Sequence, residues 1–140
     1  MIKRKDPQQI EQMKAAGALS KAALRLAGTM VIPGTSTLAI DQAVESFIRS
    51  NGGKPTFKGY GGFPGSICAS VNEQVVHGIP SDAVVLKEGD ILSVDTGATL
   101  NRWVGDNAWT FYCGEVSSEW QGLCEVTRDC LKAAIEQAVP

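Results

Sequence analysis

Hydrophobic side chains recur with a helical period at both ends of the chain and with a strand-like period in the middle. A first helix is predicted to begin at Asp6-Pro7, because aspartate is a good N-cap and proline suits the first helical position, and to end at Gly28. A second helix, capped by Ser36 or Thr37, is predicted to end at Asn51-Gly52-Gly53.

The middle of the chain predicts an antiparallel sheet. After a turn-rich segment at residues 54–65, the segments predicted to form strands are 67–71, 73–76, 90–96 and 107–112. A last helix, capped by Ser117 or Ser118, carries an apolar stripe that begins at Trp120. Two helices, then strands, then one helix is the order of an α+β fold, not of a repeated βαβ unit.

Composition and charge narrow the class of protein. The 140 residues are enough for one domain, and 44% hydrophobic with 20% charged residues is typical of a globular chain. A formal net charge of -2 argues against a nucleic-acid partner. The most apolar window, residues 22–32, contains Arg25 and is too short to span a bilayer, so no membrane partner is expected.

The N-terminal segment and the cysteines indicate the compartment. Polar residues from Gln8 onward occupy the place where a signal peptide needs an apolar run. The four cysteines form no C-x-x-C pair, and their number in this length is unlike a secreted disulfide scaffold. We therefore expect a reduced, cytoplasmic location.

Two aspartates, Asp95 and Asp106, carry the most informative chemistry. Asp95 lies near the end of an apolar strand, where a carboxylate is costly unless something pairs with it. A hairpin centred at Leu100-Asn101 would place the two aspartates directly opposite, with Cβ atoms about 5 Å apart. One or two divalent metal ions would then remove their repulsion. Two other interpretations stay open: aspartates that never meet, and a protonated carboxylate pair for acid–base catalysis.

His77 is the only histidine, which excludes zinc sites that need two or three histidines from one chain. Its apolar neighbours and Gly78 suggest a partly buried tight turn. His77 is then either a structural residue or a third metal ligand beside the two aspartates.

The glycine-rich segment 59–65 lacks the Lys-Ser/Thr of a phosphate loop. It is either a mobile loop or the wall of an apolar pocket, with the aromatics Tyr60 and Phe63 beside Cys68.

Several motifs together resemble the type I methionine aminopeptidases. They are Tyr60-Gly-Gly-Phe-Pro-Gly-Ser-Ile-Cys-Ala-Ser-Val-Asn-Glu, Val76-His-Gly-Ile-Pro, Lys87-Glu-Gly-Asp-Ile, Val94-Asp-Thr-Gly-Ala and Gly105-Asp. The N-terminal helices and the connector at residues 33–37 share the resemblance, so it covers essentially the whole chain.

The resemblance implies the pita-bread fold, a pseudo-twofold duplication around two divalent metal ions, which are Co, Mn, Fe or Zn in the family. Asp95 and Asp106 match two metal-binding aspartates. His77 matches a catalytic histidine that hydrogen-bonds the substrate near the scissile amide and does not bind metal. Tyr60, Phe63 and Cys68 match residues that line the pocket for the methionine side chain, and the family often has Tyr at the position of Phe63.

The family's remaining metal ligands, one histidine and two glutamates, lie in a second half that residues 1–140 do not contain. The resemblance therefore implies a single partial domain of an enzyme that removes the initiator methionine from peptides and nascent chains. We expect this chain to be inactive alone and to self-associate through apolar surface that the complete, usually monomeric enzyme buries. The alternatives are an Xaa-Pro peptidase of the same fold and a non-catalytic binding module.

Overall fold

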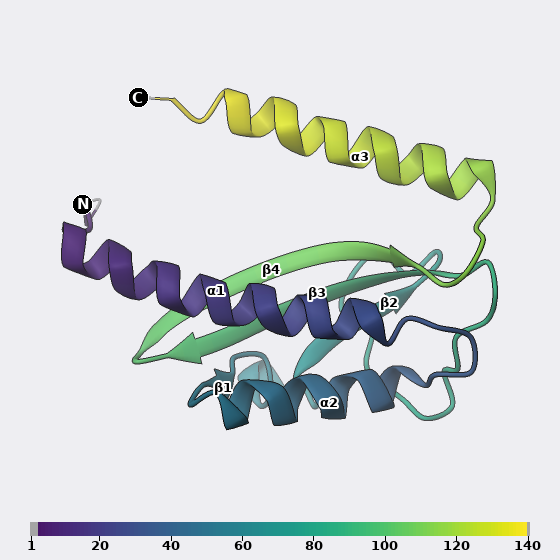
Figure 1. Cartoon of the computed structure of the whole chain (residues 1–140), viewed down its shortest axis with the longest axis horizontal. Helices are drawn as coiled ribbons and strands as arrows, with labels where there is room; N and C mark the ends of the chain where they lie inside the picture. Colours follow the sequence, from purple (N-terminus) through teal and green to yellow (C-terminus); the bar gives the residue numbers. More distant parts are fainter. Residues whose placement is uncertain (1–2, 140) are drawn as a thin grey trace.

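The structure is a computed structural model that describes residues 3–139 (Figure 1). Its elements in chain order are α1 (Pro7–Thr29), α2 (Thr37–Ser50), β1 (Lys54–Pro55), the 3₁₀ turn η1 (Tyr60–Gly62), β2 (Ile67–Val71), β3 (Ile91–Leu100), β4 (Trp103–Tyr112) and α3 (Ser118–Glu136). The predicted α+β order is confirmed. None of these helices has the length and apolar content that crossing a membrane requires.

All three helices begin where side-chain caps predict. The Asp6 carboxylate accepts from the Gln9 backbone N–H at 2.8 Å, and the Gln9 side chain accepts in return from the Asp6 N–H at 3.1 Å, which completes a capping box. Ser36 caps α2 and Ser117 caps α3 more simply, because each hydroxyl accepts from the backbone N–H three residues later.

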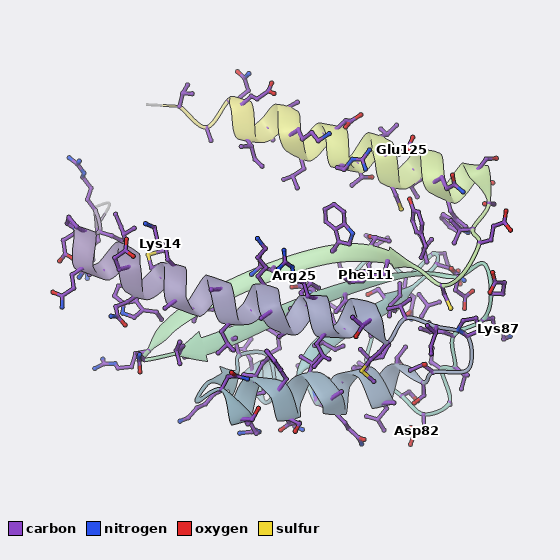
Figure 2. The ribbon with its side chains drawn as sticks, in the orientation of Figure 1. Lys14, Arg25, Asp82, Lys87, Phe111 and Glu125 are labelled. Carbon is purple, nitrogen blue, oxygen red and sulfur yellow. The ribbon has the colours of Figure 1, made fainter. Side chains whose placement is uncertain are left out.

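Gly28 does not end α1, which continues to Thr29. Its missing side chain instead makes room for the Phe111 ring of β4, which lies against α1 (Figure 2). The predicted stop at Gly28 was therefore wrong, because tertiary packing and not helix termination requires glycine there.

The sheet is antiparallel and centres on β3. β4 pairs with β3 along its whole length, whereas β2 and β1 share the other edge of β3 in succession. β3 and β4 are longer than predicted, and β1 arises in the segment expected to form only turns. The predicted strand at residues 73–76 was wrong, since these residues form a turn and an exposed connection to His77.

The hydrophobic core lies between the sheet and the pair α1 and α2. Its largest fully buried side chains include Ile40 and Ile48 of α2, Ile67 of β2 and Leu92 of β3. Both helices cover the same face of the sheet (Figure 1). α3 has no buried residue and stands apart from this core.

Candidate active site

The turn between β3 and β4 sets the position of the two aspartates. Asn101 and Arg102 both have positive φ, at 49° and 72°, which is the backbone of a two-residue type I′ hairpin turn. The register that follows pairs Gly97 with Asp106 and Asp95 with Ala108. The expected hairpin centre at Leu100-Asn101 was thus wrong by one residue, because the turn centres on Asn101-Arg102, and the aspartates are not directly opposite.

The two carboxylates nevertheless share a face of the sheet. Side chains alternate along a strand, so a shift of two residues leaves Asp95 and Asp106 on the same side. They are diagonal neighbours, for which Cα atoms lie about 7–8 Å apart, and their carboxyl groups interact. The interpretation in which the aspartates never meet is excluded by this register.

Asp95 is the more buried of the two, and its environment disfavours charge. The pKa of Asp95 is raised to about 6, mainly by burial and then by the neighbouring Asp106 carboxyl. His77 and the Thr96 N–H lower this pKa by smaller amounts. The Asp95 Oδ1 atom is buried and has no hydrogen-bond partner. Asp106 is exposed. An unpartnered buried oxygen beside a second carboxylate is the chemistry that a hard divalent cation satisfies.

A sharp turn brings His77 to the same face. His77 has φ at 61°, and Gly78 lies so close to β2 that any side chain there would overlap the Ala69 backbone. The Gly78 N–H donates to Ser70 Oγ at 3.0 Å, and its carbonyl accepts from the Ala69 N–H at 2.9 Å. His77 itself is exposed, so the expected partial burial was wrong.

Cys68 faces Asp95 across the pair β2 and β3. Burial and the negative charge of Asp95 raise the pKa of the Cys68 thiol. A hydrogen bond from the His77 backbone N–H lowers this pKa and partly offsets the rise. A protonated thiol of this kind behaves as a small apolar group, as the wall of a side-chain pocket requires.

The predicted aromatic residues lie on the loop before β2. Tyr60 is 82% exposed in η1, and Phe63 is half-buried. Phe57 also approaches the active face, because a Cβ on Gly97 would stand 2.7 Å from its ring. Gly97 is the β3 residue opposite Asp106, so the Phe57 ring borders the aspartate pair.

A groove runs from this face to α3. Cys68, His77 and Asp95 line one side of it, and Leu123, Cys124 and Leu131 of α3 line the other. Tyr60, Phe63 and Asp106 are not among its lining residues. The groove therefore unites only part of the predicted site.

Asp95 and Asp106 fit a divalent ion as two oxygen ligands, but residues 3–139 contain no group of three or more His, Cys, Asp or Glu side chains placed to hold a metal. The alternative in which His77 is a third ligand is thus contradicted. Two carboxylates and water hold a divalent ion weakly.

Sequence reasoning missed a polar network under the loop. Asp41 and Glu45 of α2 bind the loop ends at Lys58 and Ser66. One signal was available: Asp41 falls three and seven residues before Val44 and Ile48, on the apolar stripe of its helix, where a carboxylate needs a partner.

Comparison with known proteins fits this geometry. A sequence model of metallopeptidase family M24 matches residues 11–140. The chain belongs to metallopeptidase family M24. It is 50% identical over 131 residues to methionine aminopeptidase 1 of Mycobacterium tuberculosis, an alignment that covers 94% of this chain and 49% of the relative.

Solved structures share the fold. The methionine aminopeptidase of Thermotoga maritima superposes with a TM-score of 0.95 at 42% identity, over 100% of this chain and 56% of that one. The prolidase of Pyrococcus horikoshii, at 19% identity and a TM-score of 0.82 over 94% of this chain and 36% of that one, shows the fold alone. The resemblance to methionine aminopeptidases and the pita-bread fold class are confirmed, and the chain spans about half the length of the M24 relatives it matches.

Proposed function

We propose that this chain supplies the aspartate half of a methionine aminopeptidase active site, which removes methionine from the N-terminus of peptides and nascent proteins. The observation that carries the proposal is the diagonal pair Asp95 and Asp106 on one face of β3 and β4, with Asp95 Oδ1 buried and without a partner. Relatives at 50% and 42% identity that are named methionine aminopeptidases favour methionine over an Xaa-Pro substrate.

In this proposal residues 1–140 form a partial domain, in which different residues bind the metal ions and the substrate. Asp95 and Asp106 hold two divalent ions, among which Co, Mn, Fe and Zn are candidates; such ions polarise a carbonyl and activate water. His77 donates a hydrogen bond near the scissile amide, since its turn holds it beside Asp95 and Cys68. Tyr60, Phe63 and Cys68 contact the methionine side chain, and the cytoplasm is the site of action.

Metal titration by calorimetry tests the proposal. We expect Co²⁺ to bind weakly to the 140-residue chain, and Asp95→Asn or Asp106→Asn to lower the affinity by about tenfold or more. Asp129→Asn is the matched control, because it removes a carboxylate from an exposed site on α3. Co²⁺ binding that is absent, or that Asp95→Asn leaves unchanged, would favour a non-catalytic binding module instead.

The same proposal predicts that these 140 residues do not turn over substrate alone. Two carboxylates do not orient a metal ion, and the general base that the family resemblance implies lies outside this chain. An assay of methionine release from a Met-Ala peptide with added Co²⁺ or Mn²⁺ should show no appreciable rate. Turnover close to that of a full-length methionine aminopeptidase would contradict the proposal that this chain supplies only part of the active site.

A further inference from the structure

The loop that carries Tyr60 and Phe63 is tied to α2 at both of its ends. Before the loop, Lys58 Nζ lies 2.5 Å from Glu45 Oε2. After it, Ser66 Oγ donates to the same Glu45 Oε2 at 3.1 Å. One carboxylate oxygen therefore binds both ends, and seven residues span the interval between them.

Asp41, one helical turn before Glu45, strengthens the second attachment. It is 3% exposed, and its Oδ1 accepts from the backbone N–H groups of Ser66 at 2.6 Å and Ile67 at 3.0 Å. Burial raises the pKa of Asp41, which these two hydrogen bonds partly offset. This buried carboxylate fixes the start of β2, whose second residue is Cys68.

The loop between these attachments has little rigidity of its own. Gly59, Gly61 and Gly62 all have positive φ, and the hydrogen bonds described within the loop are local, such as Gly59 N–H to Phe63 O at 2.8 Å. At its end Gly65 lies against Pro80, which follows the His77 turn. The attachments to α2 therefore set where the two aromatic rings stand relative to the rest of the site.

We propose that Glu45 and Asp41 are positioning residues that hold the 59–65 loop and thereby set the affinity of the pocket for the methionine side chain. The affinity half of this inference rests on the proposed function, whereas the attachment of the loop does not. Neither carboxylate touches substrate in this arrangement; both act through Lys58, Ser66 and the backbone of β2.

Amide hydrogen exchange of residues 61–63 tests the attachment in the 140-residue chain. Lys58→Met removes the loop's cation from Glu45 and should speed exchange by about fivefold, and Glu45→Gln should do the same. The matched control is Arg49→Met, because Arg49 is also bonded to Glu45 at 2.8 Å but belongs to α2. Lys58→Arg keeps the charge and should restore slow exchange. Equal exchange in wild type and Lys58→Met would overturn the inference.

Titration with L-methionine, followed by the amide shifts of the same loop, tests the affinity. Lys58→Met and Glu45→Gln should raise the Kd by about fivefold, while Arg49→Met and Lys58→Arg should leave it unchanged. An unchanged Kd in Lys58→Met overturns a role in affinity. If wild type shows no methionine-dependent shifts, the proposed pocket fails and the affinity half fails with it, while the exchange rates still decide whether α2 holds the loop.

Discussion

Among single residues, Asp41 and Asp95 each have a carboxylate oxygen inside the fold but differ in what satisfies it. Asp41 Oδ1 accepts two backbone N–H groups, so its carboxylate is a structural group within the fold. Asp95 Oδ1 is also buried but has no partner, and a second carboxylate lies beside it. Burial raises the pKa of both, yet only Asp95 is left with an oxygen that a cation can bind.

The Asp41 carboxylate should contribute strongly to stability. Asp41→Ala leaves the N–H groups of Ser66 and Ile67 buried without an acceptor, and we expect it to lower the free energy of unfolding by about 2 kcal/mol or more. Asp41→Asn keeps a carbonyl acceptor and should cost less than Asp41→Ala. Urea unfolding of both variants measures the difference, and equal losses would show that the two hydrogen bonds are not what Asp41 contributes.

The raised pKa of Asp41 should also make the stability of the chain depend on pH. Because the pKa of Asp41 is higher in the folded than in the unfolded chain, the folded chain binds this proton more tightly. The stability of wild type relative to Asp41→Asn should therefore fall as pH rises above about 4, the unfolded pKa, and level off above the folded pKa. Urea midpoints of both proteins across this range provide the measurement. A wild-type advantage that instead grows with pH would contradict the sign.

Single residues were the most predictable part of the site. Asp95 stood out because a carboxylate near the end of an apolar strand needs a partner, and the predicted hairpin indicated Asp106 as its neighbour. The register was missed because Arg102 adopts positive φ, which a non-glycine residue rarely does and which its side chain does not signal. The exposure of His77 was also missed, and this residue too has a positive φ, of 61°, which its side chain does not signal.

Among the elements, α1 and β4 approach each other closely enough for a glycine substitution to probe their contact. A Cβ on Gly105 of β4 would overlap the carbonyl of Ala16 in α1, whereas a Cβ on Gly17 meets nothing within 4 Å. The Asn107 side chain also donates to the Gly17 carbonyl at 3.4 Å, so the two elements meet over a short stretch.

This contact makes a matched pair of glycine variants informative. Gly105→Ala should destabilise the chain by about 3 kcal/mol, because α1 must move away from β4. Gly17→Ala should stabilise it by up to about 1 kcal/mol, since alanine is the better residue in a helix interior with free space around it. Thermal or urea unfolding of both variants measures the signs. A neutral Gly105→Ala would show that α1 does not rest on β4 at this point.

Elements with strong local signals were predicted well, and those set by tertiary contact were not. Each helix start has a side-chain acceptor at its N-cap, which is visible in the sequence. β1 is only two residues long and exists because it pairs with Thr99 and Ala98 of β3. The predicted strand at residues 73–76 has apolar residues but begins in a turn and pairs with no strand of the sheet in the described residues, and Val75 remains 85% exposed.

In the whole molecule, α3 leaves an apolar groove open between itself and the sheet. Leu123 and Leu131 line this groove and are 53% and 55% exposed. Large exposed apolar patches on a folded chain favour association. We therefore expect the 140-residue chain to self-associate, as its resemblance to half of a pseudo-twofold enzyme also implies.

Sedimentation velocity at several concentrations measures this association. The sedimentation coefficient of wild type should rise with concentration, and Leu131→Glu should keep the chain monomeric by placing a charge in the groove. Val126→Glu is the matched control, because Val126 is 63% exposed on α3 but does not line the groove. Wild type that stays monomeric at high concentration would contradict the expectation.

Asp95 and Asp106 together should hold the divalent metal, and the line broadening of amide signals by Mn²⁺ tests this most directly. Mn²⁺ broadens the signals of nuclei close to it, so substoichiometric Mn²⁺ should act first on the amides of Asp95, Gly97, Asp106 and Ala108, which the strand register places together. Asp106→Asn should abolish this localised effect. Broadening that avoids these residues, or that persists unchanged in Asp106→Asn, would contradict the account.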